Sequence, residues 1–471
     1  MDQAMIKVVK TIVKTDVHEV DRISELPDSL LCHILSFLPT KDSAATSILS
    51  TRWKCLFAFV PDIDLSYTHH NPFDHQLLFG FINLCSRMIL LRKGISVRKF
   101  KLFLWGPYSK RLDVTLKSFI SGALLCQIQE FDIQLSQKNG GCKFDYPPEI
   151  LSCQTLVILK LSWGFRTNLG LPKAVCLPNL KVLHLNVWHL MDGCSIQRLI
   201  KGCPLLEELL ILVRPSNHVD IGGEKKVDVV DFSCPHMKRL IFETFEDGNN
   251  ANFIVASDCL ESLDCRLDGI WKVIINAPNI KCLHIYGPLH RLNFVGNLNS
   301  LIAIEITLES YRIPSAEDVI KFFHQALHGS SHLLPTFKNL IRLELKRHQT
   351  YDIHAFEALP LVLEKTPNLE VLVFDNVIWT DEEDEEEIES PLGAIFPSVL
   401  IENLKEIDMK YFINVEDDFK LIEHILQNAK SLTKLTIGAV PEPAVCTRIM
   451  SFRKCSEECQ IVFDDQKYKE S

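Results

Sequence analysis

One apolar pattern recurs along most of the chain: an apolar residue, two variable positions, a second apolar residue, one variable position and a third apolar residue. Near-complete copies begin at Leu156, Leu180, Leu206, Met237, Leu260, Ile280, Leu301, Leu340, Leu369, Leu404 and Leu432, with weaker copies around Phe100 and Phe131. Successive copies are about 20 to 39 residues apart, a period typical of stacked repeats. A single copy cannot cover its own apolar face, so the pattern predicts a solenoid with a parallel sheet along its inner curve.

Two interruptions of this pattern predict surface segments. The interval between Ile306 and Leu340 is long and holds an apolar stretch at 319–327, which predicts a helix on the outer face. Residues 381–389 carry eight acidic side chains, which repel one another and favour a solvated loop.

Ahead of the repeats, residues 73–91 predict an amphipathic helix with an apolar stripe of Leu77, Leu78, Phe81, Ile82, Cys85, Met88 and Ile89.

Residues 21–64 show a different, helical pattern. Its first helix is marked by Leu30, Leu31, Ile34, Leu35 and Leu38 at helical spacing. Pro27 fits the first helical position, Pro39 ends the helix and Thr40 fits the cap of a second one. Residues 50–57 predict a third helix. Three short helices bury too little surface to be stable alone, and these carry more apolar side chains than one small core needs. The pattern therefore predicts either a helical start to a larger domain or a module that a partner completes.

The C-terminal part predicts alternating strands and helices. A strand at 404–409 is followed by a helix that Asn414 can cap and whose apolar stripe is Phe419, Ile422, Ile425, Leu426 and Ala429. A strand at 431–437, a helical turn at 448–450 and a final strand at 459–464 complete the order. Such a segment can cover the open end of a solenoid, which otherwise exposes an apolar edge.

Composition narrows the class of protein. The chain of 471 residues is 47% hydrophobic and has a net charge of −10. The acidic run alone accounts for eight of these charges, so the remainder, −10 + 8 = −2, is nearly neutral and does not favour a nucleic-acid surface. The 16 cysteines are scattered without any Cys-x-x-Cys, which is typical of reduced thiols in an intracellular protein. Residues 1–20 lack the apolar run of a signal peptide and predict a disordered leader, and no run predicts a membrane span.

A search for chemistry in the sequence finds no catalytic signature. The phosphate-binding, zinc-protease and serine-hydrolase motifs are missing from the sequence. His69, His70 and His75 lack accompanying ligands at a recognised spacing, and so do Cys455 and Cys459, so no metal and no cofactor are expected. A cysteine whose histidine is close only in space stays open as a third class, an enzyme with an atypical site.

Two segments resemble known modules of one plant protein family. Residues 21–67 resemble an F-box, through Leu26-Pro27, Leu30, Ile34-Leu35, Leu38-Pro39, Ser47, Leu49-Ser50, Arg52-Trp53 and Leu56. Residues 396–465 resemble the FBD domain, through Leu404-Lys405, the helix 421–429, Leu432, Leu435-Thr436-Ile437 and 459–463, although the Pro-containing segment 439–447 departs from the usual basic and polar run. The resemblance implies an α/β chain: a three-helix F-box, an irregular leucine-rich-repeat solenoid over 68–395 with a parallel sheet on its concave face, a capping FBD module, and a tail at 466–471.

The resemblance also implies a function. F-box/leucine-rich-repeat/FBD proteins are non-catalytic substrate-recognition subunits of cullin-based, SCF-type ubiquitin ligases. The F-box would bind a Skp-type adaptor, and the repeats would capture a target protein in the cytoplasm or nucleus. The residues expected to contact the adaptor are Leu26, Pro27, Leu30, Ile34, Leu35, Leu38, Pro39, Leu49 and Trp53, of which several could instead only hold the helices together. The outward strand positions expected to contact the target are Lys160, His184, Asp264, His284, Glu344 and Asp408. The alternative is a repeat scaffold that binds a protein without ubiquitination.

Overall fold

The structure is a computed structural model that describes residues 22–23, 25–68, 75–92, 95–105, 110–136, 144, 146–163, 174–187, 193–213, 229–244, 251–266, 270–287, 291–295, 298–308, 337–347, 363–375, 402–410, 416–438 and 443–464. The predicted leader 1–20, the three histidines at 69–75, the apolar stretch 319–327, the acidic run 381–389, the Asn414 cap and the tail 466–471 lie outside the described residues or, for His75, outside the described side chains.

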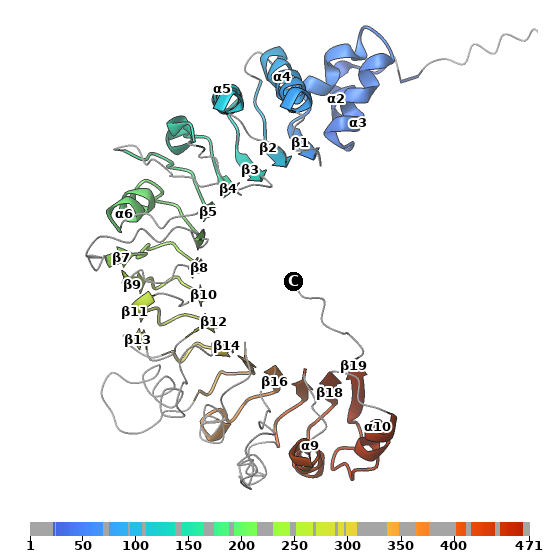
Figure 1. The fold of residues 1–471 in the computed structure, drawn as a ribbon, viewed down its shortest axis with the longest axis vertical. Helices are drawn as coiled ribbons and strands as arrows, with labels where there is room; N and C mark the ends of the chain where they lie inside the picture. The colour runs from blue at the N-terminus through green and yellow to red at the C-terminus, as the bar shows by residue number, and fades with distance from the viewer. Residues whose placement is uncertain are drawn as a thin grey trace, which may run out of the picture.

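The repeats form one parallel sheet that bends into an open arc (Figure 1). Its strands follow the order β1-β2-β3-β4-β5-β6-β8-β10-β12-β14-β15-β16-β17-β18-β19. Their bounds are β1 Asp62–Thr68, β2 Lys99–Trp105, β3 Glu130–Ser136, β4 Ile158–Trp163, β5 Val182–Val187, β6 Glu208–Val213, β8 Arg239–Thr244, β10 Ser262–Arg266, β12 Cys282–Tyr286, β14 Ala303–Leu308, β15 Arg342–Arg347, β16 Val371–Asp375, β17 Glu406–Met409, β18 Lys434–Gly438 and β19 Gln460–Asp464. Every predicted repeat copy thus contributes a strand, which confirms the solenoid.

Stacking of equivalent apolar positions produces the core. Leu159, Leu183 and Leu209 lie opposite one another in register and are all fully buried. The next inward row, two residues on, contains Leu161, Leu185 and Ile211, again buried. Because strand side chains alternate between faces, the residues between these rows point to the concave side. The core is therefore continuous along the arc and lies behind the sheet.

Asparagine side chains link successive turns at the entry to the strands. Asn179, Asn279, Asn339, Asn368 and Asn403 each donate a hydrogen bond of 2.7–2.8 Å from Nδ2 to a backbone carbonyl of the preceding repeat. These bonds satisfy carbonyl groups that the turn would otherwise leave without a protein partner. These five asparagines therefore have a structural role at the repeat turns.

The outer side of the arc changes along its length (Figure 1). Helices α4 (His75–Leu91), α5 (Lys110–Leu124), α6 (Gly193–Lys201) and the 3₁₀ turn η3 (Pro148–Ser152) cover the N-terminal half. A second parallel sheet, β13-β11-β9-β7, covers the middle, with bounds β7 Val229–Asp231, β9 Ala251–Ala256, β11 Ile270–Asn276 and β13 Leu292–Phe294. The repeat pattern of the sequence does not predict this sheet. Its inward residues, such as Phe253, Val273 and Ile275, are buried against the main core.

Helix α4 confirms most of its predicted stripe. Leu78, Ile82, Cys85, Met88 and Ile89 are buried in the solenoid core, and Phe81 packs against it. The assignment of Leu77 to this stripe was wrong, because its side chain is 54% exposed. Each residue of an α-helix is rotated by about 100° from the one before it, so Leu77 points away from the face on which Leu78 is buried.

The N-terminal helices form a separate small unit at one end of the arc. They are α2 (Asp28–Leu35), α3 (Thr40–Ala45) and two 3₁₀ segments, η1 (Thr46–Ile48) and η2 (Trp53–Phe59). Pro27 is the N-cap of α2 and not its first helical residue, and Thr40 does not cap α3. The Thr40 hydroxyl instead accepts a hydrogen bond from the backbone N–H of Asp64 in β1, at 2.8 Å.

The opposite end follows the predicted order of strand, helix, strand, helix, strand. Helix α9 (Glu416–Asn428) lies between β17 and β18, and α10 (Pro443–Met450) lies between β18 and β19. The stripe Phe419, Ile422, Ile425, Leu426 and Ala429 is buried as predicted. In the last strand, Ile461 and Phe463 pack against the core and partly cover its end. Within the described residues, no helix has both the length and the apolar character needed to cross a membrane.

Candidate functional site

The N-terminal helices have a core of their own and an uncovered apolar surface. Their core consists of Leu31, Leu35, Trp53, Leu56 and Val60, and it is distinct from the solenoid core. The other faces of these helices expose large apolar side chains. This F-box apolar surface comprises Ile23, Leu30, Ile34, Phe37, Leu38, Ile48 and Leu49, each at least 42% exposed. Contiguous apolar surface on a soluble protein marks an interaction site.

The predicted adaptor contacts divide between these two groups. Leu30, Ile34, Leu38 and Leu49 lie on the F-box apolar surface, and Pro27 and Pro39 are exposed beside them in sequence. Leu26 is half-buried and packs against the small core.

Two of the predicted contacts lie in the interior. Leu35 and Trp53 are only 1% and 7% exposed, so the expectation that they contact a partner directly does not agree with the structure. They hold the helices together and thereby support the surface. Helix α2 is amphipathic, and its two faces carry leucine alike, which is why residue type alone did not separate them.

Three members of the surface were missed. Ile23, Phe37 and Ile48 are 57%, 75% and 86% exposed. Phe37 lies seven residues after Leu30 and three after Ile34, so helical spacing could have identified it.

Arg52 holds the start of α2 in place. Its Nε and Nη2 atoms donate hydrogen bonds to the Asp28 carboxylate at 2.9 and 2.7 Å, and Nη2 also donates to the carbonyl of Leu26.

The six predicted target-contact residues lie on one row across the concave face. Strand pairing places Lys160 opposite His184, Asp264 opposite His284, and Val373 between Glu344 and Asp408. Lys160 and Asp408 are half-buried and form no ion pair with any other described residue. Burial raises the pKa of the Asp408 carboxyl, and the neighbouring Lys410 and Lys434 only partly oppose this shift.

Glu344 differs from the other five because it is buried. Its side chain is 8% exposed, and its carboxylate contacts Arg342 Nη2 at 2.9 Å, Lys410 Nζ at 3.0 Å and Lys346 Nζ at 3.2 Å. Burial alone would raise the pKa of Glu344, but the hydrogen bonds from Arg342 and Lys410 and the nearby charges outweigh it and hold the pKa at about 2. The expectation that Glu344 faces a target was therefore wrong in part: it occupies the correct row, but intramolecular partners cover it.

Both histidines of the row pair with carboxylates. His184 Nε2 lies 2.7 Å from Glu208 Oε1, and Arg239 donates to the other oxygen of Glu208 at 2.8 Å. His284 Nδ1 lies 3.6 Å from Asp264 and 3.9 Å from Glu305. The nearby Asp264 carboxylate raises the pKa of His284 above its usual value.

Between these charged sections the same row becomes apolar. Leu210 of β6 and Ile241 of β8 are paired neighbours on the concave side, and both are half-buried. Ile158 and Val182 lie on the outward row two residues before that of Leu210, Leu212 lies on the row two residues after it, and all three are also half-buried. These five residues form what we call the concave apolar window. The concave apolar window was not predicted, although the run Glu208–Val213 is apolar at both alternating positions after its first residue, a pattern that indicates a strand with two apolar faces.

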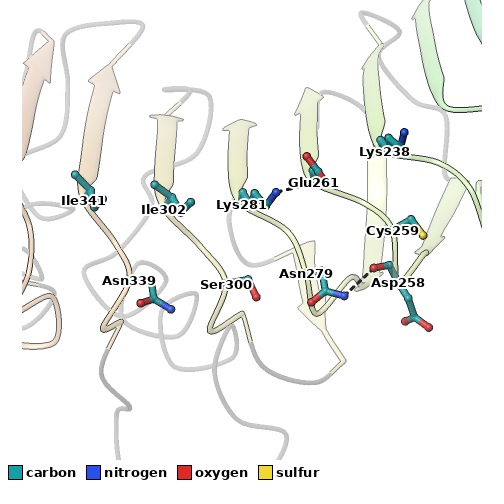
Figure 2. Close-up of a pocket in the computed structure, with 10 residues that line it drawn as sticks. All are labelled: Lys238, Asp258, Cys259, Glu261, Asn279, Lys281, Ser300, Ile302, Asn339 and Ile341. Carbon is teal, nitrogen blue, oxygen red and sulfur yellow. Dashed lines mark hydrogen bonds and ion pairs between the residues drawn. The ribbon is translucent and has the colours of Figure 1, made fainter.

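A groove of about 690 Å³ runs along the strand entries from β8 to β15 (Figure 2). Most of its polar groups have protein partners: Lys281 pairs with Glu261 at 3.3 Å, and Asn279 donates to the Asp258 carbonyl at 2.8 Å. Ile302 and Ile341 line its apolar end and are each 40% exposed. The groove is a shallow feature of the repeat edge and presents no cluster of catalytic groups.

The thiols of the core are held in their protonated form. Burial raises the pKa of Cys85 and of Cys203 to about 12, whereas a reactive cysteine needs a lowered pKa. These two cysteines therefore act as apolar core residues. In the part of the chain that the structure describes, no group of three or more His, Cys, Asp or Glu side chains could hold a metal ion.

Comparisons with known proteins agree with this architecture. Residues 23–61 match the F-box domain model, and residues 116–298 match the model described as "FBD-associated F-box protein At5g56370, LRR repeats". One solved structure, the crystal structure of a TLR13–ssRNA13 complex, aligns with 80% of this chain and 69% of that chain at 12% identity, but its TM-score of 0.22 is too low to carry an argument.

Among relatives in Arabidopsis thaliana, F-box/LRR-repeat protein At4g14103 is 29% identical over 76% of this chain and 92% of its own length. F-box/FBD/LRR-repeat protein At2g26030 is 27% identical over 94% of this chain and 99% of its own. F-box/FBD/LRR-repeat protein At4g00160 is 26% identical over 94% of each chain. Proteins with an F-box generally act as non-catalytic substrate adaptors of SCF-type ligases, and the domain generally binds a Skp-type adaptor. The two family models and these nearly full-length matches show that the chain is similar to F-box/FBD/LRR-repeat proteins along most of its length.

Proposed function

We propose that this chain is the substrate-recognition subunit of an SCF-type ubiquitin ligase, with its F-box on a Skp-type adaptor, a cullin bound through that adaptor, and a target protein on the repeats. The observation that carries the proposal is the F-box apolar surface. Residues such as Leu30, Ile34 and Leu49 are 48%, 44% and 64% exposed although the helices that present them already have a filled core. An adaptor that covers this surface would complete the module.

The concave face is the proposed site for the target. It is wide and open, and most of its charges are paired within the chain, as in Glu208 with His184 and Arg239. Paired charges cost less to bury beneath a partner than free ones. The concave apolar window would then supply the central contact, since interfaces gain most of their energy from an apolar centre with a polar rim.

The mechanism that follows is proximity. The ligase would hold a lysine of the target near a charged conjugating enzyme and so raise its effective concentration. This chain would form no covalent intermediate itself, in agreement with the protonated thiols Cys85 and Cys203 of its core. We place this activity in the cytoplasm or the nucleus.

Binding of purified Skp-type adaptor to the full chain tests the proposal. Ile34→Asp places a charge in the F-box apolar surface and should cost about 2 kcal/mol or more, roughly 30-fold in Kd. The matched control is Leu125→Asp, which adds the same charge at a leucine that is 80% exposed on the solenoid and should leave the Kd unchanged. Wild-type protein that does not bind the adaptor, or Ile34→Asp protein that binds it normally, would refute the proposal.

The alternative function is a repeat scaffold that captures a protein without ubiquitination. Such a scaffold would use the same concave face, but this function does not explain why apolar F-box residues are exposed. Reconstitution with adaptor, cullin and conjugating enzyme separates the two, because only the ligase subunit would transfer ubiquitin to a bound protein.

A further inference from the structure

One arginine is completely enclosed at the junction between the F-box and the solenoid. Arg92 follows the last residue of α4, and its side chain is 0% exposed. It lies where two separate cores meet, because Val60 belongs to the F-box core and Val97 belongs to the solenoid core. Arginine is rarely buried in full unless it is paired with an acid.

The contacts of Arg92 connect the two sides. Its Nη1 donates to the carbonyl of Val60 at 2.7 Å, at the end of the F-box, and its Nη2 donates to the carbonyl of Ser96 at 3.1 Å, ahead of β2. Its Nε is buried and has no hydrogen-bond partner among the described residues. Among the described residues no carboxylate pairs with it. Cys126 and Cys32 are the ionisable groups that act on it, and burial raises the pKa of both thiols, so they stay neutral.

Burial of an unpaired charge opposes folding, so this arrangement requires a compensating gain. The rigid, forked guanidinium can direct two donors at two fixed carbonyls, which an aliphatic side chain of similar size cannot do. In this molecule the two carbonyls belong to different units. By bonding to both carbonyls, Arg92 restricts how the F-box can be oriented relative to the solenoid.

A second hydrogen bond and one backbone contact complete the junction. The Thr40 hydroxyl of α3 accepts from the Asp64 N–H of β1 at 2.8 Å, and Thr40 is 7% exposed. The Arg98 N–H donates to the carbonyl of Pro61 at 2.8 Å. Attachment at more than one point restricts rotation of the F-box as well as its separation from the repeats.

We propose that Arg92 is a positioning residue that fixes the orientation of the F-box relative to the solenoid. Taken together with the proposed ligase function, this orientation sets where a protein held on the concave face lies relative to the adaptor. Arg92 itself touches neither partner, since it is fully buried within the chain.

Distance measurements between spin labels test the orientation directly. The labels are unnatural side chains placed at Lys41 in the F-box and Lys434 in the last repeats, both exposed, so that the native cysteines do not interfere. Arg92→Met keeps similar bulk but removes both directed bonds, and it should broaden the distance distribution. The control Arg98→Met removes an arginine at the same junction that is 55% exposed and pairs with Asp62 at the surface, and it should leave the distribution unchanged.

Two milder variants keep the test decisive if Arg92→Met does not fold. Arg92→Lys retains the charge but has no fork to reach both carbonyls, and Thr40→Val removes the second hydrogen bond at nearly constant shape. Each should broaden the distribution in protein that is still folded, as circular dichroism measures. Folded Arg92 variants with the wild-type distribution would overturn the proposal.

The consequence for function is read in the reconstituted ligase, with the lysines of the chain itself as the ubiquitin acceptors. Wild-type protein should be modified at a restricted set of lysines, as mapped by mass spectrometry. Arg92→Met and Arg92→Lys should bind the adaptor with unchanged Kd but spread the modification over more lysines. An unchanged lysine pattern would overturn the role in positioning. Failure of the wild-type chain to bind the adaptor would refute the ligase function instead and leave the distance measurement to decide on Arg92.

Discussion

Most large apolar side chains are buried in the solenoid, whereas many of those in the F-box are exposed. In the solenoid, each repeat presents an apolar edge that the next repeat covers, and leucines such as Leu183, Leu283 and Leu343 are fully buried. In the F-box no described element covers the outer side, and residues such as Phe37 and Ile48 are 75% and 86% exposed. An apolar pattern therefore predicts burial only where something is present to cover it. The repeats cover one another, whereas the described residues leave the F-box apolar surface uncovered.

The largest effect is expected from a change in the centre of the solenoid core. Leu283→Ala opens a cavity in a fully buried row, and the stacked neighbours on both sides can collapse only partly, so unfolding should become easier by about 3–5 kcal/mol. Urea denaturation followed by circular dichroism measures this loss. Because the core is continuous, the main transition itself should shift. A separate early transition, with the rest unchanged, would contradict this account.

The matching change in the F-box core should separate stability from binding. Leu31→Ala removes a fully buried side chain from the small core of Leu35, Trp53, Leu56 and Val60, with an expected local loss of about 2–4 kcal/mol. Since that core is distinct from the solenoid core, the main unfolding transition should stay in place while adaptor binding is lost. Calorimetry and an adaptor pull-down on the same preparation measure the two effects. A shift of the main transition equal to that of Leu283→Ala would show that the two cores unfold as one.

A smaller loss is expected from the buried charge of the concave face. Glu344→Gln leaves Arg342, Lys346 and Lys410 without the carboxylate they share. The protein should lose about 1–3 kcal/mol of stability, less than for a fully buried ion pair, because the lysines and the arginine are partly exposed to solvent.

The pH dependence of this loss has a defined sign. The pKa of Glu344 in the folded protein is about 2, below its ordinary value. Its stabilisation is therefore fully present above about pH 4.3, the value for the unfolded chain, and is lost as the pH falls toward the folded value. The difference between wild type and Glu344→Gln should accordingly shrink on acidification. A difference that stays constant from neutral to acidic pH would contradict this assignment.

The smallest expected effect concerns His284. The nearby Asp264 carboxylate and the charge of Glu305 raise the pKa of His284, so its folded pKa exceeds the unfolded one. The resulting stabilisation is present below the unfolded pKa and is lost as the pH rises through the folded value. Nuclear magnetic resonance titration of histidine-labelled protein should show this pKa fall in Asp264→Asn. The control is Asp132→Asn, which lies on the same row near the other end of the arc and should leave the titration unchanged.

Features that many residues specify together could be predicted from the sequence, whereas the burial of single residues could not. The strands were predictable because eleven copies agreed with one another, and the concave row followed from strand alternation alone. Single residues were less predictable. Leu35 and Trp53 resemble Leu30 and Ile34 in type, and only the packing of α2 against η2 shows which pair faces inward. The second sheet was missed because its strands lie between the repeat copies and each is short, as in Val229–Asp231.

Local periodicity is enough to predict the repeat, the number of apolar rows behind each strand and the existence of a helical module with more apolar residues than it can bury. Which residues are covered depends on packing between distant parts of the chain. Glu344 is buried because Lys410, 66 residues away in the chain, reaches it across β16, and Arg92 is enclosed because two units that are separate in sequence close around it. Burial depends on neighbours that are distant along the chain, and a local pattern cannot specify them.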